Sequence, residues 1–75
     1  MEGRGIGWAV KQLLKGSKVG RAGWNGKGMW IQIQFPDAKS KMSLPYIYMS
    51  TADGKLVPWL ASQTDILAED WEVVS

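Results

Sequence analysis

The fold depends on one stretch, Met29-Trp30-Ile31-Gln32-Ile33-Gln34-Phe35, in which apolar residues recur at every second position. This period of two is typical of a β-strand, whose successive side chains point to opposite faces of a sheet. Four residues therefore share one face: Met29, Ile31, Ile33 and Phe35. Trp30 points to the opposite face with the two glutamines. Pro36-Asp37 ends the strand and begins a polar connection to residue 45.

The sequence around this strand predicts an α+β domain that comprises residues 1–75. An N-terminal helix packs on a curved, mainly antiparallel sheet of about five strands, and a short second helix follows. The expected elements are a helix over 6–15, strands over 18–21, 29–35, 46–50, 55–57 and 71–74, and a helix of one or two turns after Ser62.

Local signals support these boundaries. The first helix carries an apolar stripe and ends in Lys15-Gly16, a basic last turn followed by a glycine stop. Asn25-Gly26 and Asp53-Gly54 are hairpin turn dipeptides. Ser62 can cap the second helix, and the carboxylate of Asp65 suits its positive end. The stripe consists of Ile6, Ala9, Val10, Leu13 and Leu14.

The composition favours a protein that associates with itself. A domain of 75 residues buries only about 60% of its unfolded surface. The chain has five tryptophans but no cysteine and no histidine, which removes disulfides and most metal sites as a means of stabilisation. We therefore expect a homo-oligomer. Because the sequence shows neither a membrane span nor a signal peptide, we expect it to be soluble and intracellular.

The lack of histidine and cysteine also argues against an enzyme, since the usual general base and thiol nucleophile are missing. The carboxylates have structural explanations: Asp53 belongs to a turn, Asp65 to a helix end, and Glu69-Asp70 to a solvated link between helix and strand. We expect no catalytic residue, no metal and no cofactor.

The run from Gly20 to Trp30 has the composition of a binding loop, with four glycines, two tryptophans and two cations. It is neither a dinucleotide fingerprint nor a P-loop, because the glycine spacing differs and no Lys-Ser/Thr pair follows. It can stack a base on a tryptophan and neutralise phosphate with Arg21 or Lys27. A tight hairpin turn between buried tryptophans explains the same residues.

Two other functions remain open. In a small single-stranded nucleic-acid-binding module, the sheet presents aromatic side chains to bases beside a basic rim. The net charge of +2 and a pI of about 9.1 permit this partner without requiring it. In a protein–protein adaptor, every tryptophan belongs to the core or an interface. The residues of the nucleic-acid alternative are Trp30, Tyr46, Tyr48, Lys39, Lys41 and Lys55.

Three blocks carry a resemblance to a known family. They are residues 23–29 (GWNGKGM), 51–59 (TADGKLVPW) and 62–71 (SQTDILAEDW), and together they cover about a third of the chain. In this order they resemble the small phage proteins of the Thoeris anti-defence two family. The chain is shorter than many relatives, and the shortening falls between Phe35 and Pro45.

The resemblance implies a non-enzymatic sponge, a homotetramer in the cytoplasm of the infected bacterial host. It captures a cyclic nucleotide-type immune signal, principally glycocyclic ADP-ribose, and holds it intact so that the effector stays inactive. Some family members also hold cyclic dinucleotides or trinucleotides in separate pockets. Membrane and nucleic-acid partners are not implied.

We expect two groups of residues to bind this signal. In the first, Trp24 stacks on adenine, Asn25 and the backbone at Gly26 make polar contacts, and Arg21 and Lys27 meet the pyrophosphate. The second group contacts the ribose or the base from the same or a neighbouring subunit. It consists of Gln63, Thr64 and Asp65.

Overall fold

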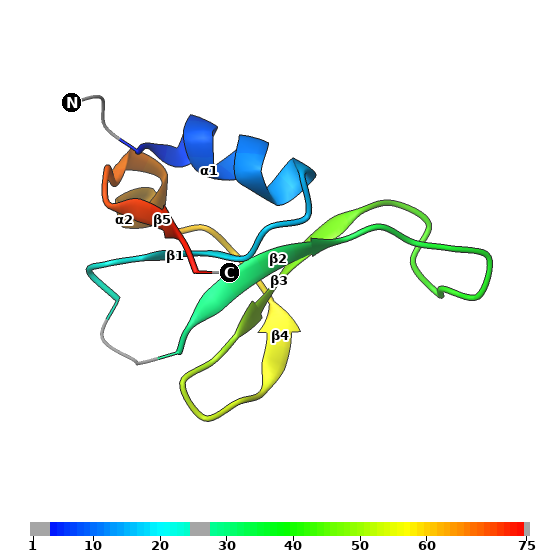
Figure 1. Cartoon of the computed structure of the whole chain (residues 1–75). Helices are drawn as coiled ribbons and strands as arrows, with labels where there is room; N and C mark the ends of the chain where they lie inside the picture. The colour runs from blue at the N-terminus through cyan, green and yellow to red at the C-terminus, as the bar shows by residue number, and fades with distance from the viewer. Residues whose placement is uncertain (1–3, 25–27, 75) are drawn as a thin grey trace.

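The computed structural model describes residues 4–24 and 28–74 and shows two helices and a five-stranded sheet (Figure 1). The elements in chain order are α1 (Ile6–Leu14), β1 (Val19–Arg21), β2 (Trp30–Gln34), β3 (Tyr46–Ser50), β4 (Leu56–Pro58), α2 (Gln63–Leu67) and β5 (Trp71–Val73). Each lies within about one residue of the bounds expected from the sequence. The α+β class is confirmed.

All neighbouring strands pair antiparallel in the order β4-β3-β2-β1-β5. The last strand in the sequence, β5, therefore pairs with the first, β1, and forms an edge of the sheet, with Arg21 opposite Trp71. Helix α1 lies across one face, over β1, β2 and β5, and α2 lies beside it (Figure 1). This topology brings the start of the 21–28 connection next to α2 and the β5 entry.

The core is small and lies between α1 and the sheet. Its fully buried side chains are Ala9, Leu13, Val19, Ile31 and Trp71. In α1 Ala9 and Leu13, four residues apart, are fully buried and Ile6 packs against the core, whereas Val10 and Leu14 are exposed. The expected five-residue stripe was thus too wide at Val10 and Leu14.

The period-two prediction for β2 holds inside the strand. Ile31 is buried, while Trp30 and Gln32 share the opposite face with Tyr48 of β3. The prediction is wrong for Phe35, which lies beyond the end of β2 and is half exposed. The alternating pattern predicts which face a side chain occupies only for residues that lie within the paired strand.

Two predicted glycine positions are confirmed by left-handed backbone. Gly16 ends α1 with φ of 95°, and the amides of Gly16 and Ser17 bind the carbonyls of Leu13 and Gln12, which makes a Schellman motif. Gly54 has φ of 85° in the β3–β4 turn. The turn expected at Asn25-Gly26 lies outside the described residues, although the strands that it joins, β1 and β2, do pair.

Candidate functional site

Arg21, at the end of β1, joins two carboxylates that come from the other end of the chain. Its Nε donates to Oδ1 of Asp70 at 2.8 Å, and its Nη1 donates to Oδ1 of Asp65 at 2.9 Å. The indole Nε1 of Trp24 donates to the same Asp65 oxygen at 3.2 Å. We call Arg21, Gly23, Trp24, Asp65 and Asp70 the Arg21 corner.

Asp65 is the buried centre of this corner, with 8% of its surface exposed. It forms a reciprocal capping box with Ser62, which stabilises the start of α2 as the sequence predicted. Burial alone raises the pKa of its carboxyl group, but the hydrogen bonds from Arg21, Trp24 and Ser62 outweigh burial and hold that pKa below its usual value. Asp65 is therefore an ionised structural acceptor at neutral pH.

Asp70 is the residue that sequence reasoning missed, since a solvated link was expected there. Three consecutive residues donate to it: Arg21 through Nε, Ala22 through its amide to the Asp70 carbonyl at 3.1 Å, and Gly23 through its amide to Oδ2 at 2.7 Å. The bond from Arg21 is the main reason why the pKa of Asp70 lies below its usual value. The carboxyl pairs with a residue 49 positions away, and no local pattern signals such a pair.

Trp24 is partly buried and belongs to a chain of edge-to-face rings. Its ring centroid lies 5.4 Å from that of Trp71 with an interplanar angle of 81°, and the Trp59 centroid lies 6.0 Å from the same Trp71 ring. Gly20 is required beneath it, because a Cβ there would lie 2.9 Å from the Met29 carbonyl and 3.6 Å from the Trp24 ring. Trp24 thus has both a structural position and a partly exposed surface.

The other expected binding residues are distributed as follows. Gln63 and Thr64 are exposed in the first turn of α2, immediately before the buried Asp65. Asn25, Gly26 and Lys27 lie outside the described residues. The structure therefore unites Arg21, Trp24 and Asp65 and places two exposed polar side chains next to them, while the ligand contacts of all eight residues stay predictions.

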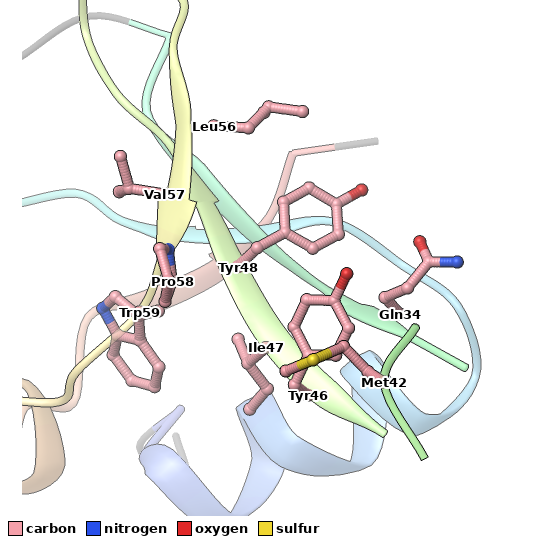
Figure 2. Close-up of a pocket in the computed structure, with 9 residues that line it drawn as sticks. All are labelled: Gln34, Met42, Tyr46, Ile47, Tyr48, Leu56, Val57, Pro58 and Trp59. Atoms are coloured by element: carbon pink, nitrogen blue, oxygen red, sulfur yellow. The ribbon is translucent and has the colours of Figure 1, made fainter. Parts of the chain in front are cut away.

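A separate apolar groove lies over β3, β4 and the 35–45 connection (Figure 2). Its volume is about 610 Å³, and we call it the tyrosine groove. Tyr46 and Tyr48 of the nucleic-acid alternative line it, but Trp30 and the three lysines of that alternative do not. Of the expected signal-binding residues, the five within the described part of the chain do not line it. The lining residues are Gln34, Met42, Tyr46, Ile47, Tyr48, Leu56, Val57, Pro58 and Trp59.

Neither a metal cluster nor a membrane span is present in the described part of the chain. Within residues 4–24 and 28–74, no three histidine, cysteine, aspartate or glutamate side chains gather closely enough to hold a metal ion. Over the same ranges, neither helix is long and apolar enough to cross a bilayer.

Comparison with known proteins then decides the family. The sequence profile of the Thoeris anti-defense 2-like domain matches residues 5–74. The chain belongs to this family. It is also 39% identical over 83 residues to Thoeris anti-defense 2 of Bacillus phage SP01, with 93% of each chain covered.

The resemblance drawn from the three sequence blocks is thereby confirmed, and family membership supports an anti-Thoeris role. The alignment with the SP01 protein spans 83 positions, more than the 75 residues of this chain. The relative therefore carries residues that this family member lacks. The expected position of the shortening, between Phe35 and Pro45, stays a prediction.

Proposed function

We propose that this family member is a non-enzymatic sponge, which acts in the infected host cell. It binds a cyclic ADP-ribose-type signal, principally glycocyclic ADP-ribose, and withholds it from the Thoeris effector. Family membership supports an anti-Thoeris role. The observation that carries the site is the Arg21 corner, where Arg21, Trp24 and Asp65 meet although 41 to 44 residues separate the partners.

The charges at this corner determine which cation, Arg21 or Lys27, can neutralise the pyrophosphate of the ligand. Arg21 contributes one positive charge, and Asp65 and Asp70 contribute two negative charges, so the ion-paired cluster is negative by one. A pyrophosphate needs further positive charge, which Lys27 of the same connection supplies in our proposal. Arg21 then acts mainly by holding the site together, since its Nε and Nη1 are engaged and Nη2 is the nitrogen left for a phosphate contact.

The neutral parts of the ligand meet the remaining residues. The exposed part of the Trp24 ring stacks on adenine, and Asn25 and the backbone at Gly26 make polar contacts to it. Gln63 and Thr64, exposed beside Asp65, bind ribose hydroxyls or a base edge. Asp65 anchors Trp24 from below through the indole N–H.

Capture without cleavage agrees with the electrostatics of the corner. Asp65 and Asp70 are the carboxylates nearest to the proposed ligand, and hydrogen bonding lowers the pKa of both. At neutral pH each is an ionised, weak base with no proton to donate. The whole chain contains neither histidine nor cysteine.

We further propose that the sponge is a homotetramer, because one domain of this size cannot enclose a dinucleotide-sized ligand. Several large apolar side chains lie open to solvent in the single chain, a pattern that favours burial in an assembly. Leu44, Leu60 and Leu67 are 75%, 91% and 76% exposed.

Titration calorimetry on the intact protein tests this proposal. Glycocyclic ADP-ribose should bind at a fixed stoichiometry per oligomer. Other cyclic ADP-ribose isomers and cyclic di- and trinucleotides are titrated separately for comparison. A single-stranded oligonucleotide series is the counter-test, because a nucleic-acid module binds more tightly as the strand lengthens and weakens steeply with salt. Absence of any heat or thermal stabilisation by the cyclic ligands well above micromolar concentration refutes the sponge.

A further inference from the structure

Asp70 accepts hydrogen bonds from three consecutive residues that lead to Trp24. Its carboxylate accepts from Arg21 Nε at 2.8 Å and from the Gly23 amide at 2.7 Å, and its carbonyl accepts from the Ala22 amide at 3.1 Å. The last residue of β1 and the first two residues of the connection that carries Trp24 are thus held by one residue just before β5.

The path from Asp70 to Trp24 has two branches. Along the side chains, Asp70 fixes the guanidinium of Arg21, Arg21 fixes Asp65, and Oδ1 of Asp65 accepts from the indole of Trp24. Along the backbone, the Gly23 amide is held by Asp70, and the next amide, that of Trp24, donates to the Arg21 carbonyl at 3.2 Å. Both the ring and the main chain of Trp24 therefore depend on Asp70.

Space at this point is limited. A Cβ on Gly23 would lie 2.9 Å from Oδ2 of Asp70 and 3.3 Å from Nη2 of Arg21. The backbone approaches the carboxylate so closely that only glycine fits without displacing it. A side chain two-thirds buried in such contacts has few alternative orientations.

We propose that Asp70 is a positioning residue for the signal site: by clamping Arg21, Ala22 and Gly23, it orients the Trp24 ring for stacking without touching the ligand. This inference rests on the proposed function for its affinity readout, because stacking on Trp24 belongs to that function. The geometry also predicts a readout that needs no ligand, namely the protection of the Trp24 indole proton.

The test compares Asp70→Asn with Glu69→Gln, which removes the same charge from the exposed neighbouring residue. In ¹⁵N-labelled protein, the Trp24 indole signal is assigned by its loss in Trp24→Phe. We expect its solvent exchange to accelerate at least ~10-fold in Asp70→Asn, and the Kd for glycocyclic ADP-ribose to rise at least ~10-fold, the usual scale for lost supporting contacts around a site. Glu69→Gln should match the wild type in both.

A stability control separates positioning from general weakening. Leu13→Val lowers stability from the buried core without removing a hydrogen bond of the corner, and should leave the Trp24 exchange and the Kd unchanged. If Asp70→Asn does not fold, Gly23→Ala probes the same contact from the other side, with the same expected changes.

The outcomes are distinct. Wild-type exchange and affinity in Asp70→Asn overturn the inference, as does an equal loss of affinity in Leu13→Val. If the wild-type protein binds no glycocyclic ADP-ribose, the proposed function fails, and the exchange of the Trp24 indole proton still decides whether Asp70 positions the ring.

Discussion

The Arg21 corner and the tyrosine groove lie toward opposite edges of the sheet and use their side chains in different ways. At the corner, side chains from residues 21 to 70 converge, and each charge has a partner within 2.9 Å. The groove has a volume of about 610 Å³ and is lined mainly by aromatic and aliphatic groups, and its Tyr48 hydroxyl already donates to Gln32 at 2.8 Å. The corner can fix orientation, whereas the groove mainly offers apolar area.

This difference teaches that a sizeable apolar cavity is not by itself evidence of a site for a charged ligand. Apolar area gives affinity without direction, while a polar ligand is oriented by hydrogen bonds and charges held in place beforehand. The predictions below therefore set each change at the corner against one in the groove or elsewhere on the surface.

Asp65→Ala should have the largest effect on stability. It removes an acceptor of Arg21, of Trp24 and of the α2 cap together, so we expect a loss of about 3 kcal/mol in the free energy of unfolding, the scale for breaking a buried pair. Urea denaturation measures it. Ser62→Ala, which removes only the cap, should cost about 1 kcal/mol. Equal losses in the two variants would mean that the ion pair contributes nothing.

Trp24→Ala should weaken binding of glycocyclic ADP-ribose by about 1–3 kcal/mol, the usual value of a base stacked on an aromatic ring. Calorimetry on both this variant and Tyr46→Ala measures the contrast, because Tyr46 offers a ring in the groove instead. The Tyr46 variant should bind like the wild type. The reverse pattern would move the ligand to the groove.

Acid should destabilise the folded protein in part by protonating the two carboxylates of the Arg21 corner. The pKa values of Asp65 and Asp70 lie below the ordinary 3.8 in the folded chain, so their stabilisation is complete above about pH 3.8 and is lost as pH falls through the lower folded values. Thermal unfolding at pH 6 and pH 3 measures the loss. Asp70→Asn should lose less stability between these pH values than the wild type.

The control for acid sensitivity is Asp37→Asn. Hydrogen bonds from Lys39 and Ser40 lower the pKa of Asp37, but this carboxylate is fully exposed in the 35–45 connection. Its replacement should change the acid response less than Asp70→Asn does, because solvent weakens the contacts of an exposed carboxylate. A larger effect at Asp37 than at Asp70 would place the acid-sensitive contact outside the corner.

Leu56→Ser should have the smallest effect. Leu56 lines the groove and is 64% exposed in the single chain, so we expect a stability change within about 0.5 kcal/mol and unaltered affinity for glycocyclic ADP-ribose. Urea denaturation and calorimetry check both values. Loss of ligand binding in this variant would contradict the assignment of the site to the corner.

The fold was largely predictable because its signals are local. The alternation in residues 30–34, the glycine stop at Gly16 and the Ser62 cap each depend on neighbours within a few positions, and each appears in the structure. Phe35 and Leu14 were misplaced because exposure at an element's end depends on where packing stops. Tertiary contact overrides periodicity at such positions.

The site was predictable only in its residue types. A glycine-tryptophan run and a helix start indicated Arg21, Trp24 and Asp65 separately, but no sequence signal joined them. Asp70 looked like a solvated link because its partners lie 47 and 49 residues away. Pairing across the β1–β5 ladder creates this contact, and that ladder is a property of the topology.

The most direct test of capture at this corner is the fate of the bound signal. The protein is loaded with glycocyclic ADP-ribose, freed of unbound ligand, and heat-denatured, and the released nucleotide is quantified by mass and by its ability to activate the effector. We predict recovery of the chemically unchanged, active signal in stoichiometric amount from the wild type, and much less from Trp24→Ala. Release of a hydrolysed product, or equal loading of the two proteins, would contradict this account.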